Sequence, residues 1–118
     1  MTVKVSSPPV ATKAMLGEAQ VQAVAELFAV LSEPTRLKVL QLLQGGPATV
    51  TRIVEELGLK QANASKQLGI LHQAGVCARE KSGTQVRYSI RMPLVFDLCA
   101  LVCKRLHEEA EARAKALG

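Results

Sequence analysis

Residues 47–90 read PATVTRIVEELGLKQANASKQLGILHQAGVCAREKSGTQVRYSI, and this stretch decides the fold expected for the chain. Thr49 is of the type that caps helix N-termini. It is followed by apolar side chains at helical spacing, namely Val50, Ile53, Val54 and Leu57. Gly58 is suited to end a helix. The first part of the stretch therefore predicts an amphipathic helix that buries one face.

A second helix is predicted to begin near Gln61 and to cover 61–74. Ala64, Leu68 and Leu71 are spaced at i, i+4 and i+7, so they point towards a core. The opposite half of this helix then consists of Ala62, Asn63, Ser65, Lys66, Gly69 and Gln73, with Gln61 exposed at the N-terminal end. The small residues Ala62 and Gly69 would let the backbone of this helix approach a partner closely.

A β-hairpin is predicted after Gly75. Its first strand covers Val76 to Lys81, its turn contains Ser82 and Gly83, and its second strand begins at Gln85. Val86, Tyr88 and Ile90 alternate with polar residues, which indicates one buried face. We expect the solvent side and the tip to hold Arg79, Lys81, Gln85, Arg87 and Arg91.

Two helices are predicted before this stretch and one after it. The first has an apolar stripe, and the second has a cap at Glu33, Pro34 at its first position and a leucine face. We expect both to build the core, through Val21, Val24, Ala25, Phe28 and Leu31 in the first and Leu37, Leu40 and Leu43 in the second. The fold class is therefore mainly α with a small β-hairpin, a winged helix-turn-helix in the order α-α-α-α-β-β-α.

The last helix begins at Pro93 and is apolar nearly all round from Leu94 to Cys103, where only Asp97 is strongly polar. Such a helix needs cover on more than one side. A homodimer formed through the terminal helices would provide this cover. It would also place two copies of the 61–74 helix, as recognition helices, for adjacent major grooves of a DNA duplex. The alternative is a central helix buried within one chain.

Charge and composition favour a polyanionic partner. The chain has 15 Lys and Arg against 10 Asp and Glu, a net charge of +5. Gln61, Asn63, Ser65 and Lys66 could contact base edges in the major groove, with Lys81, Gln85 and Arg87 on the flanking phosphates. Only three aromatic residues are present, which disfavours RNA and single strands held by stacking. Double-stranded DNA is the expected partner.

Two simpler interpretations remain for these polar surfaces. Exposed polar residues are usual on any surface helix, and Lys or Arg on a hairpin also protects edge strands from aggregation. The outward helix face could alternatively contact a protein. That interaction should depend only weakly on salt, whereas phosphate contacts weaken steeply as salt rises.

Several segments together resemble the ArsR/SmtB family of bacterial repressors. They are LSEPTRLKVL at 31–40, QANASKQL at 61–68, LHQAG at 71–75 and the hairpin around Gly83. The resemblance covers roughly Val21 to Leu106. It implies a homodimer that binds operator DNA and releases it when a metal, metalloid or oxidant reaches a sensing site.

Cys99, Cys103 and His107 are spaced at i, i+4 and i+8, which places two sulfur ligands and an imidazole on one helical face. This face could respond to a soft metal or metalloid, or to cysteine oxidation or persulfidation. Helix neighbours at this spacing are about 5–6 Å apart at Cβ, too far for a disulfide between Cys99 and Cys103 without unwinding. The alternative is that the cysteines only pack. Cys77 is expected to be core, and His72 to pack or to contact phosphate.

The sensing sites known in the family differ from this arrangement. Some members pair cysteines on the first helix of the helix-turn-helix, but 50–57 contains none. Others bind zinc-like ions through aspartate and histidines of the last helices, and here no histidine follows His107. Members that respond to sulfur species use a cysteine in the segment that here is 37–43, which has none.

The remaining expectations concern organisation. Residues 1–16 are predicted to be a flexible tail, and 17–118 a DNA-binding and dimerisation domain. No segment approaches the roughly 20 apolar residues that span a membrane, and three cysteines fit a reducing compartment, so we expect a cytoplasmic protein. The chain lacks a Gly-rich phosphate loop and a GxSxG motif, and we expect no enzyme activity.

Overall fold

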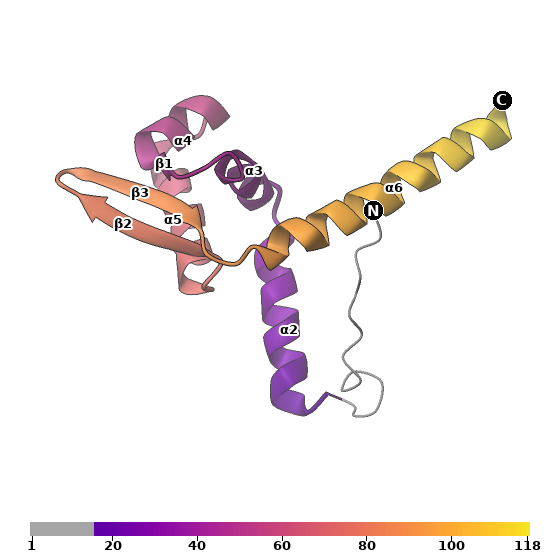
Figure 1. Ribbon diagram of the computed structural model, residues 1–118, viewed down its shortest axis with the longest axis horizontal. Coiled ribbons are helices and arrows are strands. Elements are labelled where there is room, and N and C mark those ends of the chain that lie inside the picture. Colours follow the sequence, from indigo (N-terminus) through magenta and orange to yellow (C-terminus); the bar gives the residue numbers. More distant parts are fainter. Residues whose placement is uncertain (1–15) are drawn as a thin grey trace.

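The computed structural model describes residues 16–118, so the predicted tail lies outside the described residues except for Leu16. Figure 1 shows a small winged body from which two helices project. The elements in chain order are α2 (Glu18–Leu31), α3 (Pro34–Leu43), β1 (Ala48–Thr49), α4 (Val50–Leu57), α5 (Gln61–Gln73), β2 (Cys77–Ser82), β3 (Gln85–Ile90) and α6 (Leu94–Leu117). The predicted winged helix-turn-helix is confirmed.

Local sequence signals explain the helix boundaries. The side chain of Glu33 accepts a hydrogen bond of 2.9 Å from the backbone N–H of Arg36, and Pro34 opens α3. Thr49 Oγ1 caps α4 in the same way, at 3.2 Å from the backbone nitrogen of Arg52. Gly58 ends α4 with φ of 63°, a left-handed conformation that suits glycine. These caps separate α4 from α5 where the sequence predicted the break.

The sheet has the strand order β1-β3-β2, and all pairs are antiparallel. The two residues of β1 were not predicted as a strand; they pair with Arg87 and Tyr88 of β3. The hairpin is as predicted, except that β2 continues through Ser82 and the turn consists of Gly83 and Thr84. The short strand β1 anchors the wing beside the start of α4.

The core lies under the helix-turn-helix. Ala64, Leu68 and Leu71 of α5 are fully buried, as predicted, and so is Ile53 of α4. Ile53, Leu68 and Leu71 belong to one core cluster with Val39, Leu40, Leu43, Val76, Cys77, Tyr88 and Val95. This packing fixes which face of α5 remains outside.

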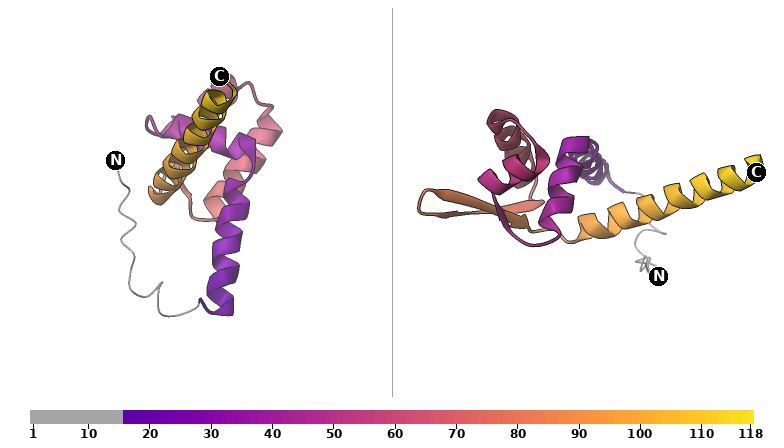
Figure 2. Two further views of the ribbon diagram at one scale, coloured as in Figure 1. Left: turned by 90° about the vertical axis from the view of Figure 1, so that its right-hand side faces the viewer. Right: turned by 90° about the horizontal axis from the view of Figure 1, so that it is seen from above.

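The predicted contribution of the outer helices to this core is wrong in part. Leu31, Leu40 and Leu43 are buried, but Val21, Val24, Ala25, Phe28 and Leu37 are exposed. The reason is that α2 and α6 project from the body (Figure 2). The radius of gyration is 17.3 Å, against about 13 Å for a compact domain of this length. One side of each projecting helix therefore faces solvent in the single chain.

No helix among residues 16–118 is long and apolar enough to cross a membrane.

Candidate nucleic-acid interface

The outward face of α5 is polar and open. Because Ala64, Leu68 and Leu71 hold the helix against the core, Gln61, Ala62, Ser65, Lys66 and Gln73 are exposed. Asn63 and Gly69 are half-buried at the edges of this face. All four residues predicted to contact bases, Gln61, Asn63, Ser65 and Lys66, thus lie on the first two turns of one helix.

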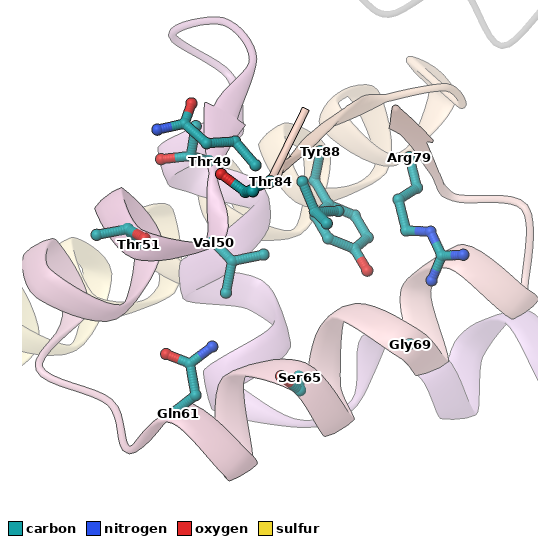
Figure 3. Close-up of a pocket in the computed structure, with 11 residues that line it drawn as sticks. Thr49, Val50, Thr51, Gln61, Ser65, Gly69, Arg79, Thr84 and Tyr88 are labelled. Atoms are coloured by element: carbon teal, nitrogen blue, oxygen red, sulfur yellow. The ribbon is translucent and has the colours of Figure 1, made fainter. Parts of the chain in front are cut away.

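A hollow of about 400 Å³ separates α5 from the wing. Its walls combine hydroxyl, amide and guanidinium groups, and it is lined by Thr49, Val50, Thr51, Gln61, Ser65, Gly69, Arg79, Thr84, Gln85, Val86 and Tyr88. In Figure 3 the phenol of Tyr88 and the guanidinium of Arg79 point towards α5, near Ser65 and Gly69. Hydroxyl and amide groups with one cation suit contact with a sugar-phosphate backbone.

The strand register corrects the predicted position of the basic residues on the wing. Directly opposed residues of an antiparallel pair share a face. Arg79 is opposite Tyr88 and Lys81 is opposite Val86, so both lie on the face of the buried residues and not on the side of Arg87. All three are nonetheless exposed. Arg79, which the predicted site left out, lines the hollow.

Arg87 has a different environment from Lys81. It is opposite Glu80 in β2 and opposite Thr49 in β1. A carboxylate on the neighbouring strand partly offsets its charge. Lys81 and Gln85 lie near the tip of the hairpin, on either side of the turn. The wing thus presents Arg79 at its base and Lys81 near its tip on one face.

Hydrogen bonds connect α5 to α2 and α3. Gln67 is only 6% exposed, and among residues 16–118 it is the one buried side chain with an amide or a charged group. Its Oε1 accepts from Arg36 Nη1 at 2.7 Å, and its Nε2 donates to Asn63 Oδ1 at 3.1 Å. Arg36 also donates through Nε to the carbonyl of Val30 at 2.6 Å. Gln67 was not among the predicted site residues, although its position on the buried side of α5 indicated a buried polar group.

The cysteines have three different environments. Cys77 is buried in the core, as expected, and burial raises the pKa of its thiol to about 11. Cys99 is half-buried and Cys103 is exposed. His72 is exposed rather than packed, so packing does not explain it.

Cys99, Cys103 and His107 line one apolar groove between α6 and α2, with Phe28, Leu31 and Leu98 among its other walls. The groove has a volume of about 760 Å³. His107 Nε2 is 3.5 Å from a carboxylate oxygen of Glu111. Within residues 16–118, no three His, Cys, Asp or Glu side chains come together as metal ligands. The metal site that the spacing of Cys99, Cys103 and His107 suggested stays a prediction.

The arrangement of recognition helix, wing and basic hollow defines a DNA-binding winged helix-turn-helix protein. A helix-turn-helix domain model matches residues 31–78. The chain is 35% identical to Rv0081 of Mycobacterium tuberculosis, an uncharacterized HTH-type transcriptional regulator, over 79% of this chain and 82% of the relative. The crystal structure of Rv0081 superimposes with a TM-score of 0.74 at 33% identity, covering 83% of this chain and 99% of that one.

Two further relatives indicate the family. A probable mercury resistance operon repressor of Streptomyces lividans is 33% identical over 75% of this chain and 82% of its own. A homodimeric winged helix-turn-helix DNA-binding domain from Mycobacterium bovis, described as a possible ArsR-family regulator, is 30% identical with a TM-score of 0.69, over 80% of this chain and 91% of that one. The chain belongs to the ArsR/SmtB family of DNA-binding transcriptional repressors. These proteins are transcriptional regulators and not enzymes.

Proposed function

We propose that the protein is a homodimeric repressor that binds double-stranded operator DNA in the cytoplasm through α5 and the wing. The observation that supports this most directly is the hollow between them, where Ser65, Tyr88 and Arg79 converge. Such a hollow can receive a strand of the DNA backbone while the outward face of α5 lies in the major groove.

In this arrangement the first two turns of α5 contact base edges through Gln61, Asn63, Ser65 and Lys66. Lys81, Gln85 and Arg87 hold the flanking phosphates, and Arg79 adds a phosphate contact from inside the hollow. Residues near the N-terminus of a recognition helix are those that reach base edges in helix-turn-helix proteins. The absence of a side chain at Gly69, beside the hollow, leaves room for the DNA backbone.

The exposed apolar surface supports the dimer. Phe28 is 54% exposed on α2, and Val102 and Leu106 of α6 are 58% and 60% exposed. Large apolar side chains that cluster on a surface mark an interaction site. A two-fold partner seated on α2 and α6 would cover them and would place two copies of α5 on one duplex.

The experiment is fluorescence anisotropy with the DNA upstream of the protein's own gene, at several salt concentrations. We expect Lys66→Ala and Asn63→Ala each to weaken specific binding by about 1–3 kcal/mol. Lys38→Ala, which removes a lysine from the exposed side of α3, is the matched control and should not change binding. Unchanged affinity for both α5 variants would contradict the assigned helix face. Binding that depends little on salt would instead favour a protein-contact module.

We further propose that a thiol-reactive signal at Cys99 and Cys103 releases the DNA. The support is that both thiols line the groove between α6 and α2, and that Cys103 is exposed. A group attached there would alter how the terminal helices pack, and through the dimer the spacing of the two recognition helices. The alternative is that Cys99 and Cys103 only pack, in a DNA-binding regulator without cysteine-based sensing.

The double variant Cys99→Ser with Cys103→Ser tests this proposal. The wild-type complex should dissociate when one of arsenite, zinc, peroxide or polysulfide is added, and the double variant should keep its DNA. Cys77→Ala serves as the control, because its thiol is buried away from the groove. Release of DNA from the double variant by the same additive would rule the two thiols out.

A further inference from the structure

We propose that Arg36, acting through Gln67, fixes the side-chain amide of Asn63 so that it presents N–H donors to DNA, and that Asn63 therefore selects guanine. This inference rests on the proposed function. It assigns Arg36 and Gln67 as positioning residues for one specificity-determining contact, and it names the base that this contact prefers.

The guanidinium group of an arginine has only hydrogen-bond donors. Since Arg36 Nη1 lies 2.7 Å from the Gln67 side chain, the Gln67 atom facing it must be the carbonyl oxygen. The Gln67 NH₂ group then faces the other way. It meets Asn63 at 3.1 Å, so the Asn63 atom there must be Oδ1. The orientation of both amides thus follows from the arginine.

Arg36 is itself held firmly. Its Nε donates to the carbonyl of Val30 at 2.6 Å and its Nη2 to that of Ala29 at 3.3 Å, both in the last turn of α2. The last carbonyls of a helix lack the i+4 partners that satisfy the others. The guanidinium therefore binds the end of α2 on one side and Gln67 on the other. Reversing Gln67 would place NH₂ against N–H donors inside the protein, where Gln67 is only 6% exposed.

The consequence for recognition follows from the base edges in the major groove. An asparagine with a free Oδ1 pairs with adenine, accepting from N6 and donating to N7. In this protein Gln67 occupies one lone pair of Oδ1, whereas the two N–H donors of Nδ2 have no hydrogen-bond partner among residues 16–118 and face the DNA. Guanine offers two acceptors, N7 and O6, and no donor on its major-groove edge. Asn63 lies in the first turn of α5, from which a recognition helix reaches bases.

The test is selection of binding sites from a random duplex library by the full-length protein and its variants. In the wild-type motif, the position that Asn63→Ala makes indifferent should be guanine, preferred about tenfold over adenine, as a base contact of about 1.4 kcal/mol would give. Asn63→Asp keeps the hydrogen bond from Gln67 but offers only acceptors, so guanine should be lost at that position. Both changes are at a half-buried surface position and leave the core intact.

Gln67→Glu tests the positioning role. The introduced carboxylate still accepts from Arg36 but cannot donate, so the amide of Asn63 turns over, donates to that carboxylate and presents Oδ1 to the DNA. The preferred base should then change from guanine to adenine or cytosine, which have donors. Gln41→Glu, the same change at an exposed position on α3, is the control and should keep guanine. Thermal unfolding followed by circular dichroism checks that each variant is folded.

Three outcomes would overturn the inference while leaving the repressor function in place. The wild type could prefer adenine at the Asn63 position, Asn63→Ala could affect no position, or a folded Gln67→Glu protein could select an unaltered motif. A wild-type protein that selects no sequence would overturn both.

Discussion

Cys77 begins β2, and its thiol is fully enclosed by the core. Burial disfavours the thiolate, so its pKa rises from 9.0 to about 11. An unfolded chain would release this proton near pH 9, whereas the folded chain keeps it until about pH 11. Folding therefore binds a proton in this interval, and stability falls as the pH rises through it.

We predict that the wild type loses up to about 2 kcal/mol of unfolding free energy between about pH 8 and pH 11 relative to Cys77→Ala. Urea unfolding of both proteins across this range measures the difference, in which contributions common to the two proteins cancel. The cavity in the alanine variant adds an offset that is independent of pH. A pH-independent difference would show that the buried thiol ionises normally.

Hydrogen bonds between residues close together in the chain could be predicted from the sequence, whereas those between distant residues could not. The caps at Glu33 and Thr49 follow from residue type and position, because each bonds a backbone group three residues away. Gln67 could be placed on α5 but not paired, because its partner Arg36 lies 31 residues earlier in the chain. A side chain's hydrogen-bond partner depends on tertiary packing, which periodicity does not specify.

Among the elements, α5 includes a glycine in its interior. A Cβ at Gly69 would meet nothing within 4 Å, and the residue has no positive φ. Glycine in a helix is less favourable than alanine by roughly 0.5–1 kcal/mol. This position is therefore unfavourable for the helix, and it lies beside the hollow between α5 and the wing.

We predict that Gly69→Ala raises the free energy of unfolding by about 0.5–1 kcal/mol and weakens operator binding, because the added methyl group occupies space left for the DNA backbone. Gly58→Ala is the matched control on the same helix-turn-helix. Its left-handed φ of 63° should make alanine destabilising there by about 1 kcal/mol. Urea unfolding and anisotropy measure the two effects. Unaltered DNA affinity in Gly69→Ala would mean that this surface lies away from the duplex.

In the wing, the buried face of one strand could be predicted from the sequence, but the face of its partner strand was not predicted correctly. The alternation of Val86, Tyr88 and Ile90 identified the buried face of β3 correctly, because a strand has a period of two. The positions of Arg79 and Lys81 were wrong because they were assigned from residue polarity alone. With a two-residue turn, the odd-numbered residues of β2 are opposite the even-numbered residues of β3, which include the buried Tyr88.

For the whole molecule, the decisive feature is the apolar surface of α2 and α6. We predict that Val102→Asp abolishes dimerisation, since it places a charge on the uncovered face of α6, where the side chain is 58% exposed in the single chain. Light scattering after gel filtration should then give about half the wild-type mass. Leu117→Asp, at the exposed end of α6, is the control and should remain dimeric. A wild-type protein that is monomeric at micromolar concentration would contradict the proposed assembly.

This surface also explains which part of the fold the sequence misassigned. Apolar periodicity identifies the inward side of a helix but not what it faces, so Val21, Val24 and Phe28 were assigned to the core of the chain. For α6 the sequence indicated an interface more directly, because a helix that is apolar nearly all round cannot be covered by one thin domain. Helix existence and chain topology could thus be predicted from 118 residues, whereas the division between core and interface required the structure.

The two projecting helices lie far apart in the chain, which has a consequence for synthesis. The apolar stripe of α2 is complete at Leu31, but the last residue of α6, Leu117, is added 86 residues later. At ribosomal rates of about 5–20 residues per second this takes roughly 4–17 s. During that time the nascent chain exposes the apolar stripe of α2 without its neighbour. Chaperone binding to the emerging chain is therefore expected at α2, before a partner subunit can cover it.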